Sequence, residues 1–235
     1  METKKPLFIT GDVHSGKTLL IKGLLSGLTQ SKQNPAAFKP FDTGLIRQNA
    51  LEQELDCEAF AQLMSGEPSS NWITPFLANE PYPVEMALRR DGLKIDWRLV
   101  HSRQKSLSDH YSHLIIETPP GLATPLDEEH QVLDWLVKEK AEVLYLVEPQ
   151  SGGLNAALLE VEQLERSGLQ YHLLFNNRSR LLDGDLMFYQ WEKLEAASNR
   201  QAIGMLPTLK ATDPKSSAAA IREHAPKLFE LLEGL

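Results

Sequence analysis

The chain has 235 residues, a formal net charge of -8 and a hydrophobic content of 42%. This composition is typical of a folded globular protein and does not indicate disorder. The negative charge disfavours nucleic acid as a partner, and Arg178 and Arg180 are too few basic residues to indicate otherwise.

The cysteine content and the apolar segments indicate the cellular compartment. Cys57 is the one cysteine, which excludes an intramolecular disulfide and a C-x-x-C metal site and fits a reducing compartment. The N-terminal apolar run leads directly into a glycine-rich loop and does not resemble a secretory signal. No stretch approaches the roughly 18 apolar residues of a membrane helix. We therefore expect a cytoplasmic protein without a membrane partner.

Apolar runs bounded by turns alternate with helical patterns along the chain. Most of these runs are apolar throughout, as buried parallel strands are. Their repeated order of strand then helix predicts one α/β domain over residues 1–235, with a doubly wound, mainly parallel sheet and helices on both faces. Strands are expected at residues 6–10, 36–39, 113–117, 142–147, 171–176 and 202–205, and helices at 17–28, 56–65, 97–112, 131–139, 154–167, 186–197 and 217–232.

Turn residues mark several boundaries between these elements. Ser167-Gly168 is expected to end a helix, and Asp213-Pro214 to mark the break before the last one. The segment 66–83 contains four prolines and reads as an irregular surface excursion.

A glycine-rich loop follows the first expected strand. Gly11, Gly16, Lys17 and Thr18 complete the pattern G-x-x-x-x-G-K-[ST], which predicts a fold of the P-loop NTPase type. In such a loop the backbone N–H groups bind phosphate oxygens, the lysine reaches the terminal phosphates and the hydroxyl can bind Mg²⁺. ATP is weakly favoured over GTP because the chain has no N-K-x-D signature. The predicted nucleotide-binding residues of the loop are Gly11, Asp12, Val13, His14, Ser15, Gly16, Lys17 and Thr18.

Three charged residues at other element ends are candidates for the same site. Glu117 ends a buried strand and Asp56 begins a helix, so both are candidate Mg²⁺ ligands, with a helix cap or a surface carboxylate as the alternative. Lys39 ends the second strand before Pro40, where it could stabilise negative charge in a transfer reaction or be a solvated lysine. His14 lies inside the loop, where we favour an outward-pointing side chain over a catalytic one.

Together with these residues, motifs over most of the chain resemble dethiobiotin synthetase, the ATP-dependent family that closes the ureido ring of biotin from 7,8-diaminononanoate and CO₂. The order and spacing of the motifs carry the resemblance, since each is weak alone. They are the phosphate loop, Phe38–Gly44, Asp56 with the following helix to Ser65-Gly66, Ile73–Phe76, Ala87–Asp96, Ile115–Glu117, Thr124–Leu126, Gly152–Asn155, Asn176 and Gly204–Pro207.

The resemblance implies an ATP- and Mg²⁺-dependent cyclo-ligase that forms a carbamate and then a carbamic-phosphoric anhydride. It implies small-molecule partners, a diamine and CO₂ or bicarbonate, and a homodimer. By residue, it implies that Lys17 and Lys39 stabilise charge on phosphate and carbamate, that Thr43 contacts the substrate and that Asn176 contacts adenine. It also implies that Thr18, Asp56 and Glu117 hold Mg²⁺. The substrate carboxylate, reached across the dimer interface, is implied to bind at Gly152, Gly153, Leu154 and Asn155. These four residues are expected at a helix start, which presents free N–H groups to an anion.

Three departures from the family pattern leave alternatives open. The phosphate loop has four residues between its glycines, where the family commonly has five. After Glu117, Thr118-Pro119-Pro120 replaces positions that carry N–H donors in the family. Tyr82-Pro83-Val84 lacks the family's histidine. A related ligase for a different amine or carboxylate is therefore the second hypothesis. A nucleotide switch or partitioning ATPase is the third, although its early loop lysine is missing from residues 11–15.

Overall fold

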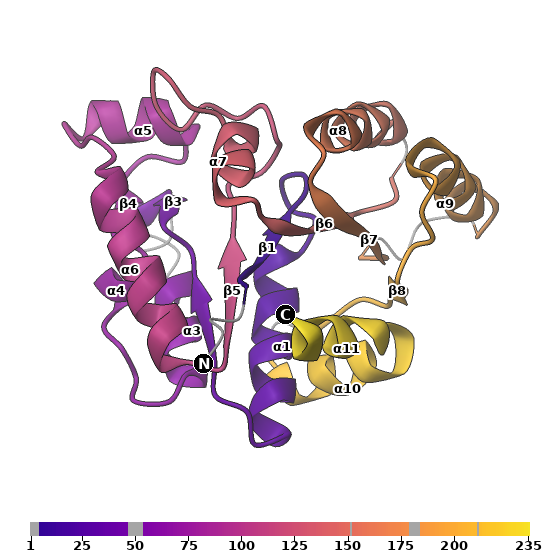
Figure 1. The fold of residues 1–235 in the computed structure, drawn as a ribbon, viewed down its shortest axis with the longest axis horizontal. Helices are drawn as coiled ribbons and strands as arrows, with labels where there is room; N and C mark the ends of the chain where they lie inside the picture. Colours follow the sequence, from indigo (N-terminus) through magenta and orange to yellow (C-terminus); the bar gives the residue numbers. More distant parts are fainter. Residues whose placement is uncertain (1–4, 47–53, 151, 179–183, 211) are drawn as a thin grey trace.

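The computed structural model describes residues 5–46, 54–150, 152–178, 184–210 and 212–235, and contains a six-stranded parallel sheet (Figure 1). The strand order is β2-β5-β1-β6-β7-β8, and all five pairings between neighbours are parallel. The predicted α/β fold is therefore confirmed. The strands are β1 Leu7–Thr10, β2 Pro35–Phe38, β5 His113–Glu117, β6 Glu142–Val147, β7 Gln170–Asn176 and β8 Met205–Leu206.

The order of the strands places a crevice at the carboxyl end of β1. The chain leaves β1 between β5 on one side and β6 on the other, so the connections after these strands diverge. Ile9 of β1 is in register with Glu117 of β5, and Phe8 with Ile116. The last residue of β5 is thus next to the start of the glycine-rich loop.

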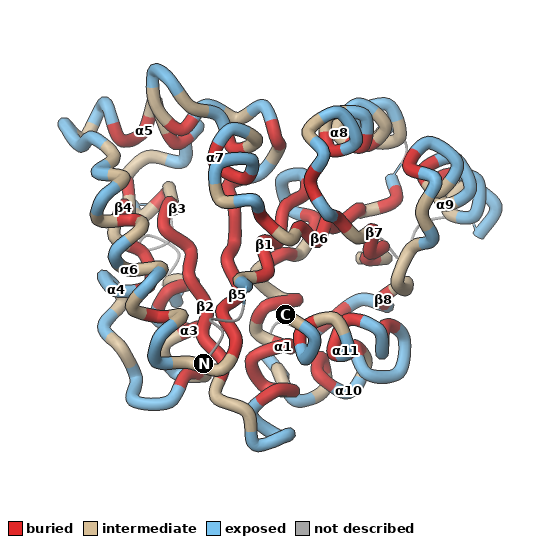
Figure 2. Tube along the Cα trace, viewed as in Figure 1, coloured by how far each residue is buried: buried red, intermediate tan, exposed pale blue. Residues whose placement is uncertain are grey.

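Helices cover both faces of the sheet. In Figure 1, α7, α8 and α9 lie on one side of β6 and β7, and α1, α10 and α11 lie on the other. Strand residues are buried from both faces, as the red tube in Figure 2 shows. The helices are α1 Lys17–Gln30, α3 Asp56–Leu63, α4 Ser70–Ile73, α5 Val84–Arg90, α6 Trp97–His110, α7 Val132–Glu139, α8 Leu154–Ser167, α9 Gly184–Ser198, α10 Pro214–His224 and α11 Lys227–Gly234.

Two helix boundaries lie where the turn residues predict them. Gly168 caps the end of α8 with a positive φ of 71°, a conformation that glycine adopts without steric cost. The Asp213 side chain accepts a hydrogen bond from the Ser216 N–H, and Pro214 occupies the first turn of α10.

The structure corrects the reading of residues 66–83 as an irregular excursion. This segment contains α4 and also β4, Phe76–Ala78, which pairs in parallel with β3, Phe41–Thr43, to form a second small sheet. Phe41 and Phe76 are buried, with ring centroids 5.9 Å apart. The four prolines of residues 66–83 by themselves predict a loop. Burial of the Phe41 and Phe76 rings instead holds part of this segment in regular structure.

Two further boundaries differ from the prediction. The last expected helix, residues 217–232, is divided into α10 and α11, because Pro226 cannot donate the hydrogen bond that a continuous helix requires. The strand expected at 202–205 is the two-residue β8 at Met205–Leu206. Among the described residues, no helix is both long and apolar enough to cross a membrane. The single domain over 1–235 stays a prediction.

Candidate active site

The loop from Gly11 to Gly16 requires glycine at both ends. Gly11 has a φ of 141°, and a Cβ there would lie 2.3 Å from the carbonyl oxygen of Leu146. Gly16 has a φ of 94°, and a Cβ there would lie 2.4 Å from Nδ2 of Asn176. Both contacts are closer than a side chain allows. The loop therefore packs tightly against the ends of β6 and β7, and Gly16 is the residue from which α1 begins.

Lys17 crosses the mouth of the loop. Its Nζ donates to the carbonyl oxygens of Gly11, at 2.9 Å, and Asp12, at 2.7 Å. The side chain is almost fully buried, and this burial lowers the pKa of Lys17 to about 8. The Glu117 carboxylate opposes this decrease, and the Lys39 ammonium adds to it. The contacts to carbonyl dipoles hold a cation at the loop, where phosphate charge would bind.

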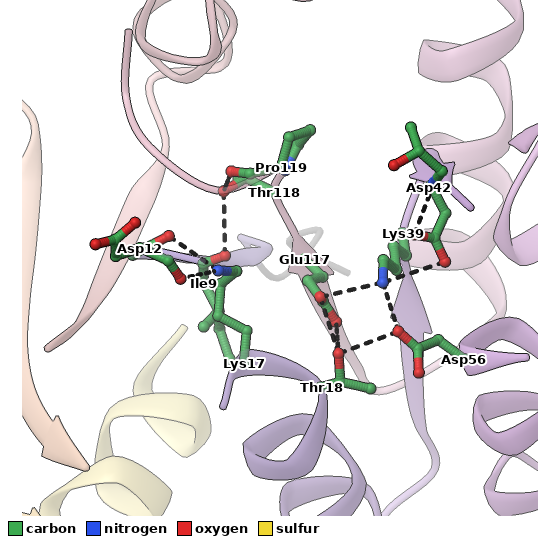
Figure 3. Close-up of polar contacts among 12 residues, drawn as sticks. Ile9, Asp12, Lys17, Thr18, Lys39, Asp42, Asp56, Glu117, Thr118 and Pro119 are labelled. Atoms are coloured by element: carbon green, nitrogen blue, oxygen red, sulfur yellow. Dashed lines mark hydrogen bonds and ion pairs between the residues drawn. The ribbon is translucent and has the colours of Figure 1, made fainter. Parts of the chain in front are cut away.

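Thr18, Asp56 and Glu117 meet beside the loop, as predicted (Figure 3). Thr18 Oγ1 lies 3.0 Å from Glu117 Oε1 and 3.2 Å from Asp56 Oδ2. A hydroxyl and two carboxylates are the oxygen donors that Mg²⁺ takes in proteins, so these residues fit the ion. In the parts of the chain that the structure describes, no group of three or more His, Cys, Asp or Glu side chains is arranged to hold a metal. The candidate set depends on the threonine for its third donor.

Lys39 is a buried member of the same cluster and not a solvated strand-end lysine. Its Nζ lies 2.5 Å from Asp56 Oδ2, 3.2 Å from Asp42 Oδ2 and 3.4 Å from Glu117 Oε1. Burial alone would lower the pKa of Lys39, but Glu117, Asp42 and Asp56 outweigh it and hold that pKa above its usual value. Lys39 is therefore positively charged at neutral pH, with its Nζ shared among three carboxylates (Figure 3).

Glu117 connects the two parts of the cluster because it contacts Thr18 on one side and Lys39 on the other. It is 4% exposed, and this burial raises the pKa of its carboxyl; Lys39 opposes the shift, and the neighbouring Asp56 adds to it. A buried carboxylate beside other carboxylates gains from an added cation. This environment favours metal binding at the Thr18 side of Glu117.

Asp42 is a member of the cluster that sequence reasoning missed. Burial raises the pKa of Asp42, and Lys39 partly offsets this effect. Its position three residues after Lys39, in Lys39-Pro40-Phe41-Asp42, is the signal in the sequence. The short strand β3 returns the Asp42 carboxylate toward the Lys39 ammonium, and this geometry appears only in the fold.

The remaining predicted loop residues differ in exposure. Asp12, Val13 and His14 are exposed, in agreement with an outward-pointing His14, and Ser15 is buried. Asn176 is fully buried at the end of β7 and its Nδ2 donates to the Ser15 carbonyl oxygen at 2.7 Å. The side chain thus supports the loop. Its Oδ1 is buried without a hydrogen-bond partner among the described residues, so an acceptor is available there; the adenine contact stays a prediction.

The predicted substrate residues lie on two other elements. Thr43 ends β3, one residue after Asp42, and its backbone N–H donates to the Asp42 side chain. Gly152 has a φ of 85°, Gly153 caps α8, and Leu154 and Asn155 form its first turn. The free N–H groups of that turn are suited to an anion, and both substrate roles stay predictions.

The loop after β5, which contains Thr118-Pro119-Pro120, is held at three points. The N–H of Thr118 donates to Ile9 O at 3.1 Å, and the N–H of Gly121 donates to Gly11 O at 3.3 Å. The N–H of Leu122 donates to Glu160 Oε1 on α8 at 3.0 Å. Backbone donors on either side of the two prolines therefore bind this loop to β1, to the phosphate loop and to α8.

Comparison with known proteins accounts for this arrangement. The family model of an AAA domain matches residues 5–216. The ATP-dependent dethiobiotin synthetase of Baumannia cicadellinicola is 30% identical over 71% of this chain and 74% of its own length. The chain belongs to the dethiobiotin synthetase family. It is a divergent member, since the enzyme of the same name from Bacillus velezensis is 24% identical over 94% of both chains.

Solved structures show the wider fold. The MinD cell division protein of Aquifex aeolicus matches 97% of both chains with a TM-score of 0.57 and 15% sequence identity. The hydrogenase maturation factor HypB of Archaeoglobus fulgidus matches 94% of this chain and 90% of its own, with a TM-score of 0.52 and 16% identity. At these identities the likeness shows the fold alone.

Proposed function

We propose that this protein is an ATP-dependent cyclo-ligase that carboxylates 7,8-diaminononanoate with CO₂ and closes the ring to give dethiobiotin. The observation that carries the proposal is the position of Glu117, whose carboxylate contacts Thr18 beside the phosphate loop and Lys39 on the other side. The phosphate loop and a second lysine, whose neighbouring carboxylates hold its pKa above the usual value, thus share one carboxylate. This is the arrangement that transfer from a triphosphate to a nearby anionic acceptor requires. Family membership supports the same reaction.

The chemistry has three balanced steps. One substrate amine adds to CO₂ and loses a proton, giving a carbamate. A carbamate oxygen attacks the γ-phosphorus, and the bond between that phosphorus and the oxygen bridging it to the β-phosphate breaks. ADP departs, and a carbamic-phosphoric anhydride is formed. The second amine then attacks the carbonyl carbon, phosphate leaves with the C–O bonding electrons, and the ureido ring closes as the amine loses its proton.

The side chains take separate roles in these steps. Lys17, at the loop, is placed to neutralise charge on the transferred phosphate, and Lys39 to hold the carbamate anion, because its pKa keeps it protonated. Thr18, Asp56 and Glu117 would hold Mg²⁺. When bound there, Mg²⁺ would neutralise negative charge on the phosphate.

The substrate's remote carboxylate is assigned to the start of α8. Gly152 and Gly153 form the turn before the helix, Leu154 and Asn155 present backbone N–H groups in its first turn, and a helix N-terminus stabilises an anion. We propose that these residues bind the carboxylate of the partner protomer's substrate in a cytoplasmic homodimer, with Thr43 contacting the diamine. Light scattering after size exclusion tests the dimer, with twice the chain mass of 26.4 kDa expected and a monomer at micromolar concentration contradicting it.

The reaction itself is tested with purified protein, MgATP, bicarbonate and 7,8-diaminononanoate, following ADP and dethiobiotin by mass spectrometry. Lys17→Ala and Lys39→Ala are expected to lower product formation by about 10²-fold or more, the loss typical of a removed charge-stabilising group. Lys105→Ala is the matched control, because Lys105 is exposed on α6 and pairs with Asp109. ATP binding without diamine-dependent ADP release would contradict the assigned substrate.

A related ligase for another amine or carboxylate is the second candidate, favoured by the loop from Thr118 to Gly121. Two prolines remove N–H donors there, and the neighbouring donors are already bonded to Ile9 and Gly11. Screening other diamines and amino acids for stimulated ADP release separates the two ligases. A nucleotide switch is ranked third, since residues 11–15 contain no lysine.

A further inference from the structure

Arg178 is a cation at the nucleotide pocket that the predicted site does not include. It lies two residues beyond the end of β7, at the same sheet edge as the phosphate loop. Its Nη1 donates to the carbonyl oxygen of His14, and its Cδ lies 3.1 Å from where a Cβ on Gly16 would be. The side chain therefore lies against the loop itself.

Asn176 and Arg178 together orient two successive peptides of the loop. Asn176 Nδ2 donates to Ser15 O, and the Arg178 guanidinium donates to His14 O. In a trans peptide the C=O and the following N–H point in opposite directions. Holding the Ser15 carbonyl toward β7 therefore turns the Gly16 N–H the other way, into the curve of the loop, where phosphate oxygens bind.

The guanidinium also lines the pocket that the loop encloses. A cavity of about 190 Å³ adjoins the start of α1, and its walls include Gly16, Lys17, Thr18, Glu117 and Arg178. Lys17 and Arg178 thus provide positive charge, and Thr18 and Glu117 belong to the candidate metal set. An arginine suits such a wall because its planar group stays charged and can donate to two phosphate oxygens at once.

We propose that Arg178 is a further nucleotide-binding residue that contacts the phosphate chain of the bound triphosphate. The proposal rests on the nucleotide use of the proposed function and extends it to a residue outside the phosphate-loop motif. Since the contact is to phosphate and not to the base, its contribution is the same for adenosine and guanosine triphosphates and for inorganic tripolyphosphate.

The test is calorimetric titration of ATP, GTP and tripolyphosphate, each with Mg²⁺, into the wild-type protein and the variants Arg178→Gln and Arg178→Lys. Gln keeps an N–H donor for His14 O but has no charge, so it separates phosphate binding from loop support. We expect Arg178→Gln to weaken all three ligands by about 10- to 100-fold, the range for a lost hydrogen bond to a charged group, with part of the loss restored in Arg178→Lys, which keeps the charge but not the planar pair of donors. Arg166→Gln, an exposed arginine paired with Glu162 on α8, is the matched control.

Other results overturn the inference. Equal affinities in wild type and Arg178→Gln would remove Arg178 from the site while leaving the proposed function intact. A loss confined to ATP and GTP, with tripolyphosphate unchanged, would place the side chain against the nucleoside. Equal loss in Arg178→Gln and Arg178→Lys with a lowered melting temperature would assign it a structural role only. A wild-type protein that binds none of the ligands would overturn the proposed function as well.

Discussion

Lys17 and Lys39 have the same charge and neighbouring positions, but their surroundings move their pKa values in opposite directions. Lys17 has carbonyl oxygens as its direct partners, and burial lowers its pKa to about 8. Lys39 is equally buried, but three carboxylates raise its pKa. At neutral pH both are charged, whereas at pH 9 Lys17 is largely neutral and Lys39 is not.

Triphosphate affinity is therefore expected to fall as the pH rises above 8. Binding to phosphate requires the protonated ammonium, so the free protein must take up a proton at pH 9, and the dissociation constant rises by about fivefold between pH 8 and pH 9. Calorimetry in two buffers of different ionisation enthalpy measures the proton uptake directly. Lys17→Arg is the control, since a guanidinium stays charged and removes the pH dependence. A wild-type dissociation constant that is constant from pH 7 to 9 would contradict this assignment.

Lys39 is expected to act on the carbamate and not on nucleotide binding. Lys39→Met should keep the dissociation constant of MgATP within about threefold and lower the rate of dethiobiotin formation by about 10²- to 10³-fold, because a charge that stabilises the reacting anion is lost. Single-turnover product analysis and calorimetry measure the two effects separately. If ATP binding and product formation fall by the same factor, Lys39 serves the nucleotide instead.

At the scale of elements, the position of α1 depends on two glycines that let α10 and α11 approach. A Cβ on Gly23 would lie 2.6 Å from Ile221 Cδ1, and one on Gly27 would lie 2.6 Å from Phe229 Cζ. Glycine within a helix costs stability on its own, so its presence at both positions reflects this close packing. Because α1 begins at the phosphate loop, the C-terminal helices help to fix the loop's orientation.

Gly27→Val is expected to destabilise the protein by about 1–3 kcal/mol through overpacking against Phe229. For a chain of this length the melting temperature should fall by roughly 2–4 °C per kcal/mol. Gly184→Ala is the control, because a Cβ at the start of α9 meets no atom of the described residues within 4 Å. A Gly27→Val protein as stable as the wild type would show that α11 moves away without cost.

For the whole molecule, nucleotide and metal are expected to stabilise the folded state together. MgATP at 100 times its dissociation constant adds about 2.7 kcal/mol, or roughly 5–10 °C in melting temperature. Chelation with EDTA should remove most of this gain, since Asp56 and Glu117 then face the phosphates without a metal ion between them. Thermal melts of the wild type with ATP, with and without Mg²⁺, measure the effect, and Lys17→Ala is the control. Equal stabilisation by ATP with and without Mg²⁺ would contradict the metal set.

The sequence by itself determined the α/β fold and much of the candidate cluster. A buried strand followed by Gly11–Thr18 predicts a phosphate loop from local sequence alone. Glu117 and Lys39 can be predicted to lie near it because parallel strands bring their carboxyl ends to one edge of the sheet. The family resemblance supplied the roles of the remaining residues. The three residues to which it assigns Mg²⁺, Thr18, Asp56 and Glu117, lie together in the structure.

Only the tertiary structure decided which side chains touch. Asp42 reaches Lys39 because β3 pairs with β4 across a stretch of prolines, and Arg178 reaches the phosphate loop because β7 lies at the same sheet edge. The sequence shows that Asp42 follows Lys39 by three residues but not that the two side chains touch, and Arg178 belongs to no motif, because the packing of distant strands sets both contacts. The pKa values have the same origin: burial lowers the pKa of both Lys17 and Lys39, and the carboxylates that the fold places around Lys39 are what turn its shift upward.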